Sequence, residues 1–491
     1  MAFSDINPGQ HKQLFIDDNA IADMEGVKRT LHQPEKQGPV IKPDPSQEQV
    51  SLQSRSVPQW NPEKDIWEWW YWGYYTVPPH GPHHSTLRRV NLYATSTDGL
   101  HWERPSLRRY EWRGTTANNI AHHPNAETLY HIIRDASEQN PQRRYKALFG
   151  VGDRALGVSP DGFDWTMLDV PPIPSQDESH FISDEFTAQY LAFVKHGTEW
   201  GRSVWLSTST DFVHFTEPAL VFHSDELDQE NRRRRIEKVV QGPTHLSPPL
   251  VDDTDHLAQV YQMAVIPYAE NLYIGFPVLF NPAGAIPPPQ RNFTGLNQVE
   301  LTVSRDLQNW QRVADRALFI EVDEWDGINY GTAQNLLCGR PIVHEDSEIR
   351  FYYNAVRFRG HKALYPAEYA EFFNDIGALC LAKLRLDGFV SLDADTEGTV
   401  TTKPFTLTGE HLIVNADATH GELRAEILDA ETLAPLPGLS ADDCVPLHGD
   451  HLRGQLRWSA QPKSEKPVSL RFTLKQAKLY AFSLMADENQ L

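Results

Sequence analysis

The stretch YATSTDGLHW (residues 93–102) runs from a strand-like segment into a tight turn and ends on an aromatic residue. Its pattern is a serine, an aspartate two positions later and an aromatic residue four positions after that. The pattern returns as SPDGFDW (159–165), STDFVHF (209–215) and SRDLQNW (304–310). An Asp side chain accepts hydrogen bonds from backbone amides two residues on, and Gly tolerates a positive φ. Each copy therefore predicts a hairpin between two strands.

A weaker fifth copy, LRLDGFVSL (384–392), keeps Asp387 and Gly388 but loses the serine and the aromatic residue. Before every copy lie two strand-like segments, an aromatic-rich one and an alternating one. Self-similarity at this scale decides the architecture of a chain. Two strong strands and a hairpin, repeated five times, predict an all-β, five-bladed β-propeller whose longer loops gather at its faces.

Near residue 395 the pattern changes to evenly alternating strands, such as HLIVNADA (411–418) and VSLRFTL (468–474). Alternation of polar and apolar residues is typical of two sheets packed face to face. We therefore expect a propeller over residues 1–395, with residues 1–40 closing the ring. A C-terminal β-sandwich is expected over residues 396–491.

Composition limits the partners and the location. The formal net charge is −21, which disfavours nucleic acid and anionic membranes as partners. No apolar stretch approaches the roughly 18 residues of a membrane span, and the first residues lack the features of a signal peptide, so a cytoplasmic location is expected. The 3 cysteines predict buried reduced thiols. The basic run NRRRRIEK (231–238) is interpreted as a solvated loop or an intersubunit contact, which leaves a homo-oligomer open.

Carboxylates at the start of the inner strands would meet in one central funnel. Each has a structural alternative, such as capping a turn, and only one of two successive residues on a strand can face inward. The catalytic candidates are Asp135 in the second blade, Asp184 and Glu185 in the third, Asp326 in the fifth, and Asp18 near the first.

Cleavage of a glycosidic bond needs one carboxylic acid and one carboxylate. Their separation decides the stereochemical outcome, about 5 Å for retention and roughly 6.5–9.5 Å for inversion. Crowding of carboxylates also separates their pKa values, which divides the work between acid and base. Aromatic rings give sugars an apolar face to stack on. The substrate-binding candidates are Arg134, Arg144, Trp325, Tyr330, Arg55 and Glu48.

The segment RDASEQNPQRRYK (134–146), together with the five-fold repeat and the predicted β-sandwich after it, resembles glycoside hydrolase family 32 and its relatives in families 43, 68 and 117, and segments such as LFIDD (14–18) and WDG (325–327) point to a closer likeness. Over nearly the whole chain it looks more closely like a bacterial group described as family-32-like. The resemblance implies a five-bladed propeller followed by a β-sandwich. It also implies an aspartate nucleophile in blade one, an aspartate of an Arg-Asp-Pro motif in blade two, and a glutamate acid farther on.

The family motifs carry over only in part. Arg134 and Asp135 match the second motif, with Ala136 in place of the proline. In IDDNA (16–20), Asp18 matches the nucleophile motif without its proline. The Glu-Cys acid motif is absent, which leaves Glu185 or Asp184 as substitutes by position.

The sequence predicts an exo-acting glycoside hydrolase that acts on short oligosaccharides, with no certain cofactor and a divalent metal ion on the axis left open. A polysaccharide lyase is one alternative, in which Arg55 or Arg144 neutralises a uronate carboxyl group. A non-catalytic sugar-binding propeller is the other. The candidate bases for the lyase are His122, His123, His131, His245 and Tyr330.

Overall fold

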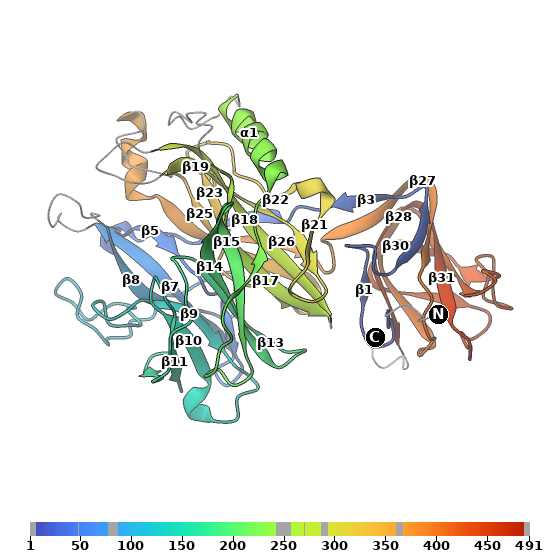
Figure 1. The fold of residues 1–491 in the computed structure, drawn as a ribbon, viewed down its shortest axis with the longest axis horizontal. Coiled ribbons are helices and arrows are strands. Elements are labelled where there is room, and N and C mark those ends of the chain that lie inside the picture. The colour runs from blue at the N-terminus through green and yellow to red at the C-terminus, as the bar shows by residue number, and fades with distance from the viewer. Residues whose placement is uncertain are drawn as a thin grey trace.

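The chain is mostly β, as predicted. The computed structural model describes residues 6–47, 49–76, 87–241, 257–269, 271–285, 293–359 and 367–485. Figure 1 shows a larger body and a smaller one that contains the C-terminal strands. The helical segments of the described residues are α1 (Glu226–Val240) and the 3-10 turns η1 (Pro45–Gln47), η2 (Pro141–Arg143), η3 (Ala314–Arg316) and η5 (Ala367–Asn374).

The strands of the larger body pair into five successive antiparallel groups. The first three follow one another along the chain. Group 1 contains β5 (Gln49–Gln53), β6 (Gln59–Asn61), β7 (Ile66–Thr76) and β8 (Leu87–Ser96). Group 2 contains β9 (Leu129–Arg134), β10 (Tyr145–Phe149), β11 (Ala155–Ser159) and β12 (Thr166–Met167). Group 3 contains β13 (Ser179–Asp184), β14 (Gln189–Thr198), β15 (Gly201–Ser209) and β16 (Ala219–Phe222).

Groups 4 and 5 have additional short strands. Group 4 contains β17 (Gln259–Ala269), β18 (Leu272–Ala285), β19 (Phe293–Glu300), β20 (Thr302–Ser304), β21 (Trp310–Arg312) and β22 (Leu318–Ile320). Group 5 contains β23 (Gln334–Leu337), β24 (Ile342–His344), β25 (Glu348–Val356) and β26 (Gly377–Arg385), and the N-terminal strand β4 (Glu35–Ile41) pairs with β26.

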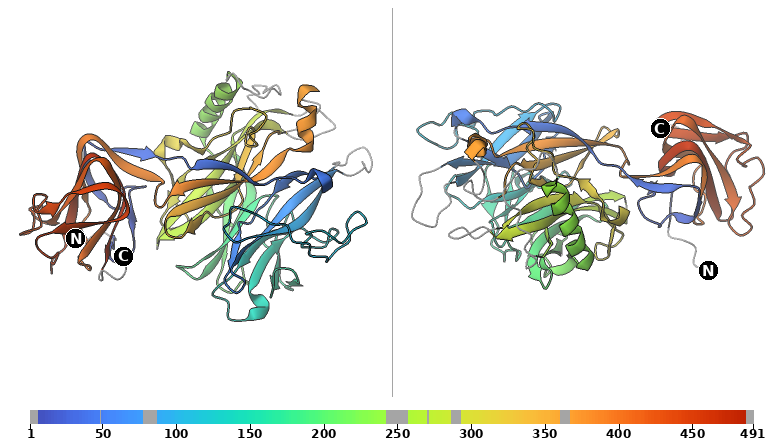
Figure 2. Two further views of the ribbon diagram at one scale, coloured as in Figure 1. Left: turned by 180° about the vertical axis from the view of Figure 1, so that it is seen from behind. Right: turned by 90° about the horizontal axis from the view of Figure 1, so that it is seen from above.

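Each group contacts the next, and the last returns to the first. The first strands of neighbouring groups contact one another, β6 with β9, β9 with β13, and β13 with β17. Group 4 joins group 5 through the parallel pair Asn297 and Gln334, and group 5 joins group 1 through Gly377 and Ser51. Figure 2 shows the larger body and the smaller C-terminal body from behind and from above. We call the segments β5–β6, β9, β13, β17 and β23 the inner strands.

The four serine–aspartate turns connect paired antiparallel strands, so the predicted hairpins are confirmed. In each copy the Asp accepts amide hydrogen bonds from residues two and three positions later, as Asp211 does from Val213 and His214 at 2.8 Å. The residue after the Asp has a positive φ in every copy, +72° at Gly99 but also +57° at Phe212. Glycine therefore suits this position without being required there.

The smaller body is one eight-stranded sheet that encloses its own apolar core. Its N-terminal strands β1–β3 pair with the C-terminal strands β27 and β31. Strand β27 runs unbroken through residue 395, where the sequence predicts a domain boundary. The strands are β1 (Gln13–Leu14), β2 (Ile21–Glu25), β3 (Lys28–Leu31), β27 (Val390–Thr402), β28 (His411–Asp429), β29 (Cys444–Val445), β30 (Leu447–Trp458) and β31 (Val468–Met485).

The junction between the two bodies is both apolar and charged. Leu14 and Ile16 pack into the largest apolar core of the larger body. The fifth, degenerate turn lies here, and the buried Asp387 accepts hydrogen bonds from Lys12 at 3.0 Å and Tyr268 at 2.7 Å. Asp17 forms a two-pronged ion pair with Arg305, both contacts at 2.9 Å. The degenerate copy thus joins the two bodies.

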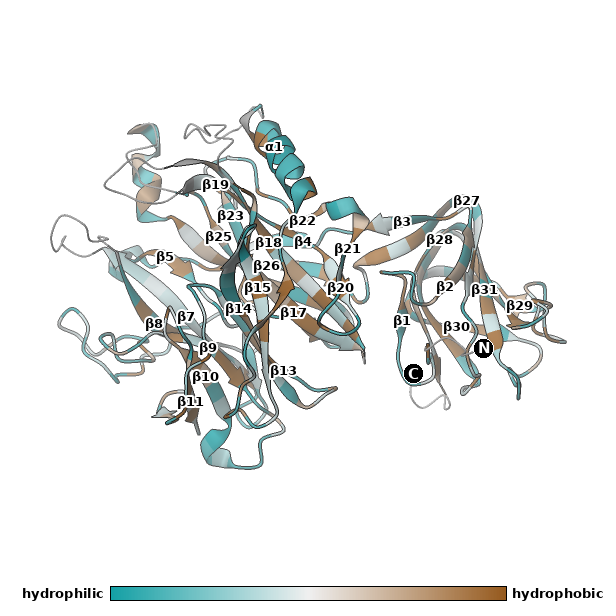
Figure 3. Cartoon of the chain, in the orientation of Figure 1, coloured by the Kyte–Doolittle hydropathy of each residue, from teal (hydrophilic) through white to brown (hydrophobic). Residues whose placement is uncertain are grey.

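The basic run of residues 232–235 lies in helix α1, so its interpretation as a loop is wrong. Arg232 and Arg235 are buried, whereas Arg233 and Arg234 are exposed. Figure 3 shows α1 coloured mainly hydrophilic. The helix is held by its two buried arginines, because Arg232 donates to the carbonyl of Pro282 and Arg235 to Glu300.

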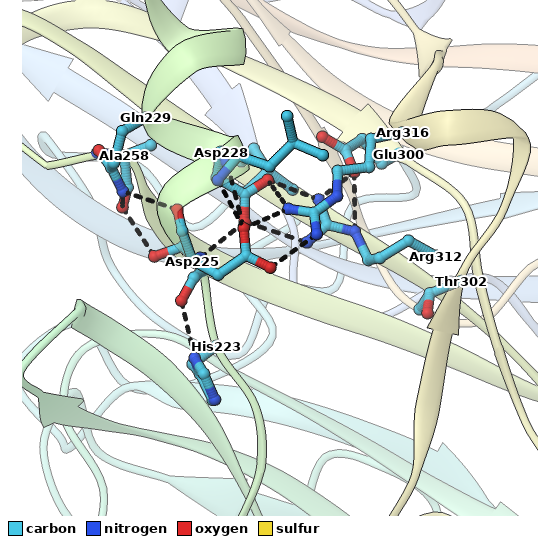
Figure 4. Close-up of polar contacts among 12 residues, drawn as sticks. His223, Asp225, Asp228, Gln229, Ala258, Glu300, Thr302, Arg312 and Arg316 are labelled. Carbon is cyan, nitrogen blue, oxygen red and sulfur yellow. Dashed lines mark hydrogen bonds and ion pairs between the residues drawn. The ribbon is translucent and has the colours of Figure 1, made fainter.

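A cluster of paired charges fixes the start of α1 (Figure 4). Asp225 caps the helix and forms a two-pronged ion pair with Arg316, at 2.5 and 2.6 Å. Arg312 bridges the fully buried carboxylates of Asp228, at 2.9 Å, and Glu300, at 3.0 Å. Since every carboxylate here has an arginine partner, the cluster attaches the helix to group 4.

The three cysteines, Cys338, Cys380 and Cys444, are free and buried, which confirms the predicted reduced thiols. In the part of the chain that the structure describes, no helix combines the length and the apolar character needed to cross a membrane.

Candidate active site

The inner strands β9, β13, β17 and β23 begin at one shared cluster of charged and aromatic side chains, which Arg55 joins from the link between β5 and β6. Contacts between the side chains bring together residues from groups 1, 3, 4 and 5, and Tyr130 of group 2 borders them. We call this set the Tyr261 cluster. Its members are Arg55, Asp177, Glu178, Lys195, Arg202, Tyr261 and Arg359.

Glu178 is the buried carboxylate of the cluster. It lies just before β13 and is 5% exposed. Arg55 grips it with two nitrogens, Nη2 at 2.6 Å and the closer Nε, and the hydroxyl of Tyr130 donates to it at 3.1 Å. Burial raises the pKa of the Glu178 carboxyl, but the Arg55 guanidinium outweighs that effect and leaves the pKa below its usual value. Glu178 is therefore ionised and linked to groups 1 and 2.

Asp177 is the accessible carboxylate. Its side chain is 54% exposed and accepts a hydrogen bond from Lys195 Nζ at 2.8 Å. Burial raises its pKa, but Lys195 more than compensates, and the net shift is downward. Asp177 is thus ionised at neutral pH and open to solvent on one side.

Lys195 is buried between this aspartate and an aromatic ring. Its Nζ lies 4.4 Å from the centroid of the Tyr261 ring. Burial lowers the pKa of Lys195 to about 8, although Glu178 and Asp177 oppose the shift. A group with that pKa can give or take a proton near neutral pH. Burial also raises the pKa of Tyr261, so its hydroxyl stays protonated.

Two further guanidinium groups complete the cluster. The Cζ atoms of Arg202 and Arg359 each lie 5.5 Å from the centroid of the Tyr261 ring. Arg359 also lies 4.1 Å from the Phe280 ring and donates to Gln334 at 2.8 Å. The starts of β17 and β23 are thereby joined to the same site.

A cavity of about 60 Å³ lies between the inner strands, below Arg55. Four of the five groups contribute to its wall, which shows that the inner strands surround a common space. The wall consists of Arg55, Ser56, Val57, Gln59, Ile132, Ile133, Arg134, Phe181, Ile182, Ser183, Gly339 and Arg340.

The sequence places Asp135 and Asp184 at the start of inner strands, but both lie at the opposite end. Asp184 is the last residue of β13, and Asp135 follows the last residue of β9. Asp135 is bonded to Lys146 at 2.7 Å and to Tyr190, and Asp184 accepts from Tyr273 at 2.8 Å. Burial raises the pKa of Asp135, but Lys146 and its other donors outweigh burial and lower it to about 2. Both carboxylates hold neighbouring groups together.

The end of the inner strands that holds Asp135 and Asp184 also holds Glu185, Arg134 and Arg144. Glu185 is exposed and pairs with Arg340 at 2.9 Å, and Arg134 pairs with Glu63 at 3.0 Å and borders the axial cavity. Arg144 is half-buried and has one long hydrogen bond, to the carbonyl of Ala136 at 3.4 Å.

The remaining candidates are dispersed. Asp326 is exposed and accepts two amide hydrogen bonds of its own turn, from Ile328 and Asn329, at 2.7 Å. Trp325 packs on Phe358 and Phe372, and Tyr330 donates to Asp375. Asp18 pairs with Arg29 beside the C-terminal sheet. Glu48 lies outside the described residues.

The histidines considered as bases differ in environment. His131 is buried between the carbonyl of Arg55, at 2.6 Å, and Ser179, at 2.7 Å, and burial lowers its pKa well below the usual value. His122 hydrogen-bonds the carbonyl of Glu127, and His123 contacts Tyr110 and the amide of Asn125. His245 lies outside the described residues. Within the described ranges no group of three or more His, Cys, Asp or Glu side chains is placed to hold a metal ion.

Of the predicted residues, the structure brings only Arg55 into the Tyr261 cluster. The sequence does not single out Asp177, Glu178 and Lys195, because it predicts that the inner strand of group 3 begins near Asp184. The available signal was the acidic pair immediately before the alternating segment SHFISD (179–184). Arg202 and Arg359 carry no local signal, since their proximity depends on how distant strands pack.

No protein-family model matches the chain, and no curated protein matches its sequence. Several solved structures align over about three quarters of it. One titled "Glycoside hydrolase" is 13% identical, covers 72% of this chain and 92% of its own, and has a TM-score of 0.41. An alpha-L-arabinofuranosidase from Podospora anserina in complex with cellotriose is 11% identical over 72% and 97%, with a TM-score of 0.40. An N-acetylgalactosamine deacetylase from F. plautii is 15% identical over 74% and 97%, with a TM-score of 0.38.

Proposed function

We propose that the protein is a carbohydrate-active enzyme, a glycoside hydrolase whose active site is the Tyr261 cluster. In this proposal, the five strand groups are the blades of a five-bladed β-propeller within residues 1–395. The propeller is of the family-32-like type. The sheet of β1–β3 and β27–β31, which contains the predicted C-terminal domain of residues 396–491, is treated as a β-sandwich. The observation that carries it is that an exposed ionised carboxylate, Asp177, lies 2.8 Å from an amine, Lys195, with a pKa of about 8, where the inner strands begin.

These two groups can perform hydrolysis. The ammonium of Lys195 gives a proton to the leaving glycosidic oxygen while the C–O bond breaks. Because Asp177 lies 2.8 Å from that ammonium, both groups act on the same face of the sugar: after the leaving alcohol has departed, Asp177 takes a proton from the water that enters in its place, whose oxygen forms the new bond to the sugar. The proton on Asp177 then returns to Lys195 through their hydrogen bond. Glu178 acts as a positioning residue, because it holds Arg55 and Tyr130 across two other groups.

The experiment is a screen of chromogenic furanosides and pyranosides, followed by turnover against pH on any substrate found. Hydrolysis with Lys195 as the acid requires its protonated form, so turnover should fall as pH rises through about 8. Lys195→Met and Asp177→Asn should each lower turnover at least about 100-fold. Unchanged turnover in both variants, with native circular dichroism, would contradict the site assignment.

Elimination is the second candidate, and the same amine favours it. Neutral Lys195 could take the proton beside a uronate carboxyl group, and no water would be consumed. Turnover would then rise with pH through about 8, and the unsaturated product would absorb in the ultraviolet. The direction of the pH profile therefore separates hydrolysis from elimination.

Some features expected from the sequence remain predictions. They are the cytoplasmic location, an oligosaccharide as substrate without nucleic-acid or membrane partners, a homo-oligomer, and an axial metal ion. Catalytic roles for Asp135, Asp184, Glu185, Asp326 and Asp18 are the untested alternative to the Tyr261 cluster. Substrate-binding roles for Arg134, Arg144, Trp325, Tyr330 and Glu48 are untested as well.

A further inference from the structure

We propose that the Tyr261 cluster selects a negatively charged sugar residue, one that carries a carboxylate or a sulfate ester. This inference rests on the proposed function, since it names the substrate class for the same site. It starts from the charges of the cluster, where four cations, Arg55, Lys195, Arg202 and Arg359, surround two carboxylates. The excess of positive charge is local, because the whole chain has a formal net charge of −21.

The two carboxylates are already used. Glu178 is held by Arg55 with two hydrogen bonds, and Asp177 is held by Lys195. Arg154, which stacks 3.9 Å from the Tyr130 ring, is also occupied, because it donates to four backbone carbonyls, among them those of Gln176 and Asp177. Asp177 interacts electrostatically with Arg202 and Arg359, but its hydrogen bond goes to Lys195.

Among the described residues, Arg202 is the cation of the cluster whose guanidinium has an unsatisfied donor. Within the described ranges it has no ion-pair partner, and its buried Nη1 has no hydrogen-bond acceptor. Leaving such a donor unsatisfied costs free energy, so an anion that accepts its hydrogen bond is favoured. Burial lowers the pKa of Arg359, and Arg202 adds to that shift as a neighbouring positive charge. A bound anion would accept a hydrogen bond from Arg202 and would oppose the lowering of the Arg359 pKa.

Aromatic rings fix the direction of these guanidiniums. Arg202 lies 5.6 Å and Arg359 4.1 Å from the centroid of Phe280, and both lie 5.5 Å from that of Tyr261. A guanidinium stacked on a ring keeps the N–H groups at its edge for a ligand, and their fork matches the oxygens of a carboxylate or a sulfate. The half-buried Tyr261 ring adds an apolar surface against which a sugar ring can lie.

The test is calorimetric binding to the full-length protein of trigalacturonate, its neutral counterpart galactotriose, and a sulfated galactose disaccharide. We expect an anionic ligand to bind at least ten-fold more tightly than galactotriose, with an affinity that falls as salt is added. Arg202→Gln should weaken that binding at least ten-fold. The matched control is Arg233→Gln, which removes an exposed arginine of α1 and should leave binding unchanged.

Binding and turnover separate the two proposals. Preference for trigalacturonate supports a carboxylate as the recognised group, and preference for the sulfated disaccharide supports a sulfate ester. Equal binding of all three sugars, or anion binding that survives Arg202→Gln, overturns the inference. Charge-dependent binding without cleavage would sustain it while refuting the hydrolase, and cleavage of neutral sugars alone would do the reverse.

Discussion

The two ends of the inner strands use the same kinds of side chain for different purposes. At the finishing end, three buried carboxylates each accept a hydrogen bond from a tyrosine of the following group, Glu68 from Tyr145, Asp135 from Tyr190, and Asp184 from Tyr273. The pattern repeats from group to group and leaves these acids saturated.

At the starting end no such repeat exists. Asp177 is half exposed, burial lowers the pKa of Lys195 to about 8, and among the described residues Arg202 Nη1 has no acceptor. The comparison teaches that the number of acidic residues does not identify a site in this fold. What distinguishes the starting end is a half-exposed carboxylate, Asp177, hydrogen-bonded to a buried amine, Lys195, whose pKa is about 8.

The largest effect on stability should come from the buried ion pair of the starting end. Glu178→Ala would leave Arg55 buried and unpaired, and we expect the free energy of unfolding to fall by about 3 to 5 kcal/mol. Chemical denaturation measures this. The control is Glu185→Ala, which breaks an exposed pair with Arg340 and should cost less than about 1 kcal/mol. Equal losses would mean that burial of the pair does not matter.

The next largest effect on stability is expected from Asp135, at the finishing end of the inner strands. The pKa of Asp135 is lowered from 3.8 to about 2, so its ionised form stabilises the fold by roughly 2 kcal/mol at neutral pH. This contribution is present above pH 3.8 and disappears as pH falls toward about 2. Asp135→Asn should therefore lower the unfolding free energy at pH 7 and flatten its decline in acid. The exposed Asp169→Asn serves as control, and an identical acid profile in both variants would refute the prediction.

A smaller loss of unfolding free energy is expected when the tyrosines that join the groups are replaced by phenylalanine. Tyr273→Phe removes a hydrogen bond to the buried Asp184 and should cost about 1.5 kcal/mol. Tyr190→Phe removes the equivalent bond to Asp135. Because the two bonds join different pairs of groups, the double variant should show additive losses in thermal and chemical unfolding. Strong non-additivity would argue against independent contacts.

The smallest effect concerns the repeated turn. In Ser159→Ala the amides of Asp161 and Gly162 lose their acceptor, and we expect a loss of about 1 kcal/mol. The corresponding loss in Ser96→Ala should be similar, since the same two amide contacts are present there. A loss of unfolding free energy larger than that of Tyr273→Phe would contradict the expected order of these effects.

Local chemistry made the repeat predictable. The spacing of serine, aspartate and aromatic residue is enough to specify a turn, because every hydrogen bond that forms it lies within three residues. The aromatic-rich and alternating segments likewise predict their strands. The helix was not expected, because Arg232 and Arg235 are buried by contacts with residues far along the chain.

The site was harder to predict for the same reason. The sequence predicts Asp184 at the start of β13, whereas the strand ends there and the Tyr261 cluster lies at its other end. Arg55 was identified, but its partner Glu178 is 123 residues away, and no local pattern connects them. Arg202, Tyr261 and Arg359 meet only because their strands belong to neighbouring groups.

The measurement that tests the central claim most directly compares Asp177→Asn with Asp184→Asn, two variants at opposite ends of the same inner strand. Turnover is measured on a substrate identified by the glycoside screen, with folding checked by circular dichroism. The account predicts a loss of at least about 100-fold for Asp177→Asn and near-normal turnover for Asp184→Asn. Normal turnover in Asp177→Asn together with an inactive, folded Asp184→Asn protein would contradict it.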